Sequence, residues 1–172
     1  MKRILPLIAV FLLLLPGCRS ASTKRNEKNS PPDLPTSFTS ELYITHGTRE
    51  YEANYIQRSL TDAELEFTAP ATVKGLKVTL SGAQCTFSYG TLSFSADVSS
   101  LPQSGVGRII AESVREAADT AATQTAKENG MWVTKGSISD IEFTLQRSDN
   151  GLPLRLEVPQ TTLSVDFRNT KQ

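Results

Sequence analysis

The chain has 172 residues, of which 38% are hydrophobic, and it carries 18 basic and 18 acidic side chains. This length and composition suit a single globular domain with a core of its own. The balanced charge, without a basic patch, argues against binding to nucleic acid.

The N-terminus has the pattern of a secretion signal. Lys2 and Arg3 precede an apolar stretch over residues 4–15, which is shorter than the roughly 20 residues that a helix needs to span a bilayer. Removal of this segment would take two basic side chains with it and leave the remainder slightly acidic.

The sequence Leu15-Pro16-Gly17-Cys18 follows the apolar stretch and resembles the lipobox of bacterial lipoprotein precursors, although Ala or Ser is commoner than proline at its second position. It predicts a signal peptide over 1–17 and a lipid on Cys18, because the thioether to diacylglycerol requires a thiol. The membrane, reached through this lipid, is then the expected partner, and the extracytoplasmic face of the cell membrane the expected location. The alternative is an ordinary signal peptide with an incidental cysteine.

Residues 18–37 are polar and rich in Ser, Lys, Asn and Pro. This composition cannot form a core and predicts a disordered tether between the lipid and the folded part. We expect the folded domain over 38–169 and a polar tail over 170–172.

Alternation of apolar and polar residues predicts about nine or ten short antiparallel strands on either side of one helix, a mostly β domain of the α+β class. A tight hairpin turn with positive φ is expected at Gly47, next to the only histidine, and another at Gly90. The expected strands are 38–44, 51–56, 63–69, 75–80, 84–89 and 91–98 before the helix, and 132–138, 141–147, 152–158 and 163–167 after it.

One long helix is expected from Gln103 to about Asn129, directly after Pro102, with Asn129-Gly130 as its C-terminal stop. At helical spacing, one face carries Val106, Ile110, Val114, Ala117 and Ala121. The second half of this face is mostly alanine, which fills little volume.

The sequence contains none of the common catalytic or metal-binding patterns: no glycine-rich phosphate loop, no HExxH and no CxxC. We therefore expect no catalytic site, no metal, no cofactor and no enzymatic activity. Cys85 alternates with Phe87 and Tyr89 on one face of a strand and is interpreted as a small buried apolar residue. It has no disulfide partner if Cys18 is acylated.

The order of these elements resembles the lipoprotein-carrier fold, in LolA/LolB-like proteins and related lipoproteins. The resemblance rests on the strand 63–70 that ends in proline, the following Gly75-Leu76 strand, Asn150-Gly151-Leu152-Pro153, and the final Phe167-Arg168-Asn169. It implies a curved antiparallel half-barrel wrapped on one long helix. The lipobox and the lack of an extended N-terminal helix depart from the soluble carriers and favour a tethered holder over a shuttle.

An incomplete barrel with an apolar inner face must be filled by side chains, by a helix or by a ligand. We therefore predict a cavity for an acyl chain, a lipid or lipoprotein ligand, or another apolar molecule. The alternative is a ligand-free interaction module of the cell envelope whose core is full. The residues predicted to line the cavity are Phe67, Phe87, Tyr89, Phe94, Trp132 and Phe143 on strands, and Ile110, Ala117 and Ala121 on the helix.

Overall fold

The computed structural model describes residues 30–103 and 105–172, and its compact unit spans Pro31–Gln172. The predicted signal peptide and Cys18 lie outside the described residues. Within the described part, no helix is both long and apolar enough to cross a membrane.

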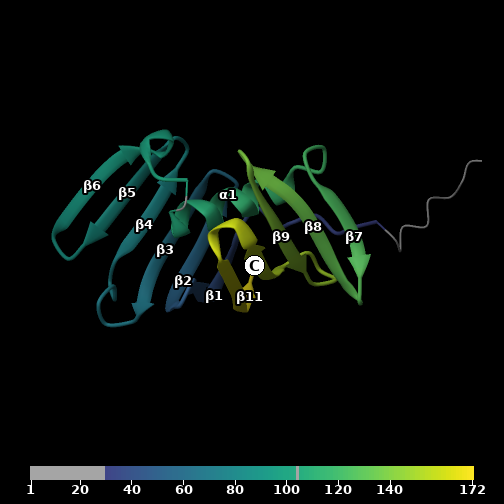
Figure 1. The fold of residues 1–172 in the computed structure, drawn as a ribbon, viewed down its shortest axis with the longest axis horizontal. Coiled ribbons are helices and arrows are strands. Elements are labelled where there is room, and N and C mark those ends of the chain that lie inside the picture. The colour runs from purple at the N-terminus through teal and green to yellow at the C-terminus, as the bar shows by residue number, and fades with distance from the viewer. Residues whose placement is uncertain (1–29, 104) are drawn as a thin grey trace, which may run out of the picture. The chain divides into compact units, whose positions relative to one another are not determined.

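A single antiparallel sheet of eleven strands forms the domain, in the order β6-β5-β4-β3-β2-β1-β11-β10-β9-β8-β7 (Figure 1). The first meander comprises β1 (Phe38–His46), β2 (Arg49–Ser59), β3 (Asp62–Ala69), β4 (Lys77–Ser81), β5 (Gln84–Tyr89) and β6 (Leu92–Asp97). The second comprises β7 (Gln124–Glu128), β8 (Met131–Ile138), β9 (Ile141–Arg147), β10 (Pro153–Val158) and β11 (Leu163–Lys171). Between them lies α1 (Val106–Ala118), the one α-helix of the described residues.

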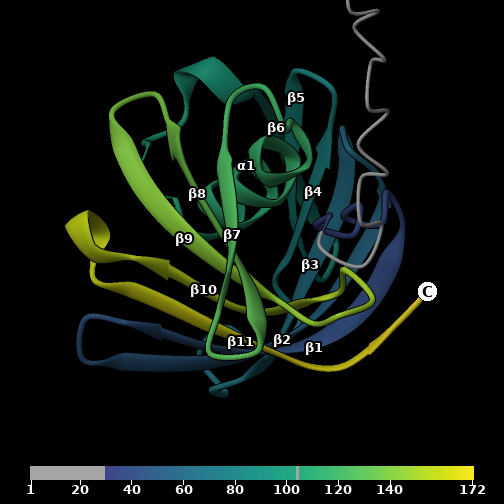
Figure 2. The ribbon, with the colours of Figure 1, turned by 90° about the vertical axis from the view of Figure 1, so that its right-hand side faces the viewer.

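The two meanders join where β1 pairs with β11, so the first and last strands lie in the middle of the sheet. The helix connects one edge strand, β6, to the other edge strand, β7. The sheet curves around α1 without closing into a barrel (Figure 2). This is the mostly β half-barrel with one helix that the sequence predicts.

The helix packs on the concave face of the sheet through a fully buried stripe that includes Ile110 and Val114. At its first turn, a Cβ on Gly107 would lie 3.2 Å from Cγ1 of Val78 and 3.6 Å from Cδ2 of Leu65. The start of α1 therefore approaches β3 and β4 closely, and glycine keeps that approach free of a clash.

The helix is shorter than predicted. It ends at Ala118 and not near Asn129. The carboxylate of Asp119 accepts a hydrogen bond from the backbone N–H of Ala121 at 2.9 Å, and Thr123 donates its hydroxyl to the backbone carbonyl of Asp119 at 2.8 Å. Such local bonds from Asp and Thr compete with helical ones. Ala121 consequently lies exposed in a turn, and its predicted place on the inner helix face is wrong.

The end of the predicted helix is instead the strand β7, the one strand that the sequence did not predict, which pairs with β8. Asn129 and Gly130 have φ of 50° and 83°. Two central residues with positive φ define the type I′ hairpin turn, for which Asn-Gly is the preferred sequence. The interpretation of Asn129-Gly130 as a helix stop was therefore wrong.

Both ends of the domain differ from the predicted boundaries. Residues 31–37, assigned above to the tether, begin the compact unit, and Leu34 is buried in its core. Nη1 of Arg147 donates a hydrogen bond to the carbonyl of Pro32 at 2.9 Å. A Cβ on Gly151 would lie 2.2 Å from the carbonyl oxygen of Asp33, so this contact needs glycine. At the other end, β11 runs on into the predicted tail 170–172.

Truncation of the buried helix stripe is expected to destabilise the domain. Ile110→Ala should lower the free energy of unfolding by about 2–5 kcal/mol, since it leaves a cavity between α1 and the sheet. Arg115→Ala, on the exposed side of the same helix, should change it by less than about 1 kcal/mol. Urea unfolding measures both, and equal effects of the two substitutions would contradict the burial of Ile110 against the sheet.

Candidate functional site: an apolar groove at the β6 edge

The concave face of the first meander is apolar from its centre to its edge. Val78 on β4 pairs with Leu65 on β3 and with Phe87 on β5. Phe87 in turn pairs with Phe94 on β6, the edge strand. Directly opposed residues of neighbouring strands point to the same face. The period-2 pattern thus places one continuous row of apolar side chains across four strands.

The helix covers this row only in part. Leu65 and Val78 are buried beneath α1, and Phe87 is half-buried. Further out, Tyr89 is 50% exposed, Phe94 63% and Leu92 73%. Among the described residues these three make up most of the large apolar side chains that are exposed, and all belong to the β5–β6 hairpin.

Two cavities of about 200 Å³ and 370 Å³ follow this uncovered row, and both are lined by Leu76 and Phe87. We call them together the apolar groove. Such volumes approach or fall within the range of about 300–1,000 Å³ that is usual for small-molecule sites. Its apolar side chains are Phe67, Leu76, Val78, Phe87, Tyr89, Leu92, Phe94, Leu101, Pro102 and Val106.

Among the residues that the structure describes, Arg108 is the one charged side chain that lines the groove, and its guanidinium is already hydrogen-bonded. Its Nε lies 3.0 Å from Oε1 of Glu112, one helical turn further on, and its Nη1 donates to the carbonyl of Leu101 at 2.9 Å. Arg108 therefore holds the loop before α1 against the helix at the mouth of the groove. A site of this kind favours an apolar ligand and offers little to orient a polar one.

Cys85 lies at the inner end of the groove and is 1% exposed. It is buried, as the sequence predicts, and this burial raises the pKa of its thiol. The neutral thiol is thus favoured, and Cys85 acts as a small apolar wall residue.

The structure brings four of the predicted lining residues together in the groove, namely Phe67, Phe87, Tyr89 and Phe94. The predicted helix residues Ile110 and Ala117 are buried in the core and hold α1 to the sheet. The exposed Ala121 lies in the turn after α1, outside the groove.

The two remaining predicted aromatic residues lie on the second meander, away from the groove. The ring of Phe143 is buried against Gly136, where a Cβ would lie 2.8 Å from its Cζ. Trp132 is buried beside Lys127, whose Nζ lies 5.3 Å from the ring centroid. Sequence alternation places both rings on a strand face, but it does not show which half of the sheet stays uncovered.

Sequence reasoning missed the loop that precedes α1. Leu101 and Pro102 line the groove although they belong to no strand or helix. No periodic signal marks such residues, because their position depends on the tertiary contact with Arg108. Leu76, in contrast, carries a usable signal, since it alternates with Val78 and Leu80.

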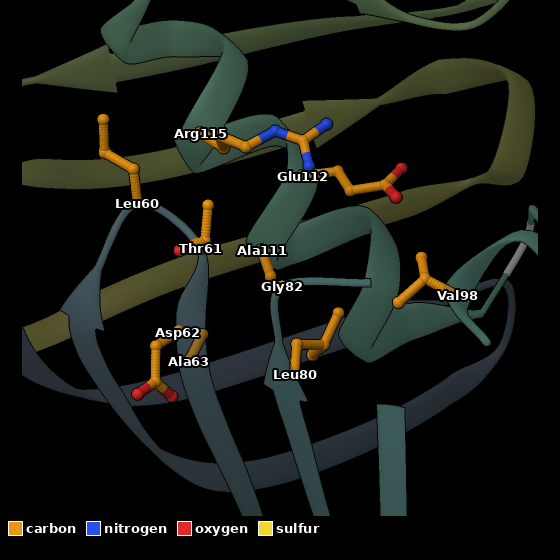
Figure 3. Close-up of a pocket in the computed structure, with 10 residues that line it drawn as sticks. All are labelled: Leu60, Thr61, Asp62, Ala63, Leu80, Gly82, Val98, Ala111, Glu112 and Arg115. Atoms are coloured by element: carbon orange, nitrogen blue, oxygen red, sulfur yellow. The ribbon is translucent and has the colours of Figure 1, made fainter. Parts of the chain in front are cut away.

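A second hollow lies under the middle of α1, between the helix and the β2–β3 and β4–β5 turns (Figure 3). Ala111, Glu112 and Arg115 from the helix face Leu80 and Val98 across it. Its volume is about 20 Å³, which is enough for a single water molecule. It is therefore too small for a ligand.

Within residues 30–103 and 105–172, no cluster of three or more His, Cys, Asp or Glu side chains is arranged to hold a metal ion.

No protein-family model and no curated protein matches the sequence, whereas several solved structures resemble the fold. A solved structure of an uncharacterized conserved protein from Thermus thermophilus superposes with a TM-score of 0.50 at 10% identity, over 80% of this chain and 78% of that one. A LolA superfamily protein from Nitrosomonas europaea superposes with a TM-score of 0.45 at 12% identity, over 84% of this chain and 90% of that one. At these identities the likeness concerns the fold alone. The curved antiparallel sheet with one helix on its concave face (Figure 2) is the half-barrel that the sequence predicts.

Burial of Cys85 predicts slow thiol chemistry in the native state. In the chain from residue 19 onward, Cys85 is the only thiol. Its reaction with a disulfide reagent at neutral pH should be much slower in buffer than in denaturing urea, because the buried group is both inaccessible and kept protonated. Absorbance of the released thiolate follows both reactions, and equal rates would show that the inner end of the groove is open.

Proposed function

We propose that this protein is a membrane-anchored lipoprotein whose half-barrel binds an acyl chain or another apolar ligand in the apolar groove. The observation that carries the proposal is the row of apolar side chains that runs from the buried core to Tyr89, Leu92 and Phe94, whose outer end no described segment covers. Covering such surface is worth roughly 25 cal/mol per Å² of apolar area.

The shape and chemistry of the groove support an extended apolar ligand. Its inner end reaches Cys85 beneath the helix, and its outer end opens at the β5–β6 turn. A flexible acyl chain fits a site that is long and apolar, and whose single guanidinium is engaged by Glu112 and by a backbone carbonyl. A polar head group would remain at the open end.

The anchoring half of the proposal rests on the sequence Leu15-Pro16-Gly17-Cys18. A lipid on Cys18 holds the domain at the extracytoplasmic face of the membrane, where apolar ligands with acyl chains are available. The polar residues that follow the cysteine lead to the compact unit, which begins at Pro31.

Ligand binding is tested with dansylaminoundecanoic acid, a fluorescent fatty-acid probe, added to the chain from residue 19 onward, which retains the whole compact unit. The wild-type chain should bind the probe with an increase in fluorescence. Phe94→Ser should weaken binding about tenfold, which corresponds to about 1.4 kcal/mol, roughly the transfer free energy of part of a phenyl ring.

Leu154→Ser is the matched control. Among the described residues, Leu154 is the one large apolar side chain that is exposed outside the β5–β6 hairpin. It should leave probe binding unchanged. Absence of probe binding by the wild-type chain would reject the ligand-binding proposal, and equal losses in both variants would place the probe elsewhere.

Anchoring is tested with the full chain expressed in bacteria that are fed an alkyne analogue of palmitate. The wild-type chain and a Cys85→Ala variant should both incorporate the label, whereas Cys18→Ala should incorporate none and accumulate uncleaved or released from the membrane. Label retained on Cys18→Ala would show that Cys18 is not the lipidated residue.

A further inference from the structure

The edge strand β6 has one side that pairs with no other strand among residues 30–103 and 105–172. It pairs only with β5, and nearly all its residues are exposed. An uncovered edge is a template for pairing with another strand, and proteins usually protect it with charges, proline or a bulge. The opposite edge, β7, is protected in this way: Lys127 and Glu128 form ion pairs with Asp149 and Lys135.

Strand β6 carries none of these protections along its length. Its sequence, Leu-Ser-Phe-Ser-Ala-Asp, contains no lysine and no proline, and its register with β5 is continuous from end to end. Its one charge, Asp97, stands at the last position.

The hydrogen bonds show which backbone groups face the free edge. The N–H of Val98 donates to the carbonyl of Ala83 at 2.8 Å, and this pair continues the β5–β6 register. Because hydrogen-bonded pairs alternate along an antiparallel ladder, Leu92, Phe94 and Ala96 direct their backbone groups to β5. Ser93 and Ser95 therefore present unpaired N–H and C=O groups outward.

We propose that β6 pairs with β6 of a second copy of this chain, antiparallel and centred on Phe94. In this register Ser93 lies opposite Ser95 of the other copy, and the two residues exchange the hydrogen bonds that are free in the monomer. Phe94 lies opposite Phe94 at the two-fold axis, as a non-hydrogen-bonded pair whose side chains come close together.

The same register is complementary in its side chains. Leu92 lies opposite Ala96 of the other copy, so apolar residues meet on the concave face and serines meet on the convex face. Asp97 lies opposite Thr91, so no like charges oppose each other. The two concave faces turn to the same side, and the two apolar grooves join at the axis.

The pairing is tested by sedimentation velocity over a range of concentrations, with the chain from residue 19 onward. The wild-type chain should form a dimer whose share rises with concentration. Ser93→Pro removes one outward N–H without removing a bond to β5, and should abolish the dimer. Ser93→Ala keeps that N–H and should dimerise as the wild type does.

A folded Ser93→Pro chain, checked by far-UV circular dichroism, that still forms dimers would overturn the proposal, as would a wild-type chain that stays monomeric throughout. If Ser93→Pro does not fold, Phe94→Lys provides the second variant. It places two ammonium groups together at the axis and should likewise give a monomer; a dimeric Phe94→Lys chain would overturn the proposal.

The same samples separate this proposal from the ligand-binding one. A monomeric wild-type chain that binds dansylaminoundecanoic acid refutes only the pairing of β6. A dimer that depends on the Ser93 N–H but binds no probe supports the pairing and refutes only the ligand.

Discussion

The structure depends on a mismatch between an apolar sheet face and the one helix that covers it. A helix of 13 residues is about 20 Å long at 1.5 Å per residue. Eleven strands spaced about 4.8 Å apart extend over about 48 Å along the curved sheet. One helix therefore cannot cover the concave face, and other groups must cover what remains.

The two halves of the sheet meet this requirement differently. On the second meander, Phe143 and Trp132 are buried, and the segment that begins at Pro31 adds Leu34 to the core. Arg147 and Gly151 hold that segment through its backbone carbonyls. On the first meander, no described segment plays this part for the β5–β6 hairpin, and the apolar row stays open.

The two edges of the sheet also differ in charge. The β7 edge carries ion pairs and is well suited to water, whereas the β6 edge offers apolar side chains and free backbone groups. Both an apolar ligand and a second copy would use the same surface, the first through side chains and the second through backbone hydrogen bonds. The two proposals are compatible, because strand pairing would use the backbone groups of Ser93 and Ser95 at the outer edge, whereas a ligand would lie against the side chains of Phe87 and Phe94.

Local patterns in the sequence were sufficient for most of the fold. Period-2 alternation predicted ten of the strands, and the turn at Gly90 was predicted because its positive φ suits glycine. The burial of Cys85 was also predictable, since it depends on which face of the strand the residue occupies. The half-barrel was implied by the resemblance to the lipoprotein-carrier fold. The predicted lipid on Cys18 rests on sequence alone.

Other features were decided only by tertiary structure. The alanine-rich segment after Ala118 suits a helix by composition, but the bonds around Asp119 and the partner strand β8 make part of it a strand. The alternation of apolar and polar residues places both Phe94 and Phe143 on the apolar face of a strand. Whether such a ring is buried or exposed depends on how far a single helix reaches across a wide sheet, a distance that no local pattern encodes.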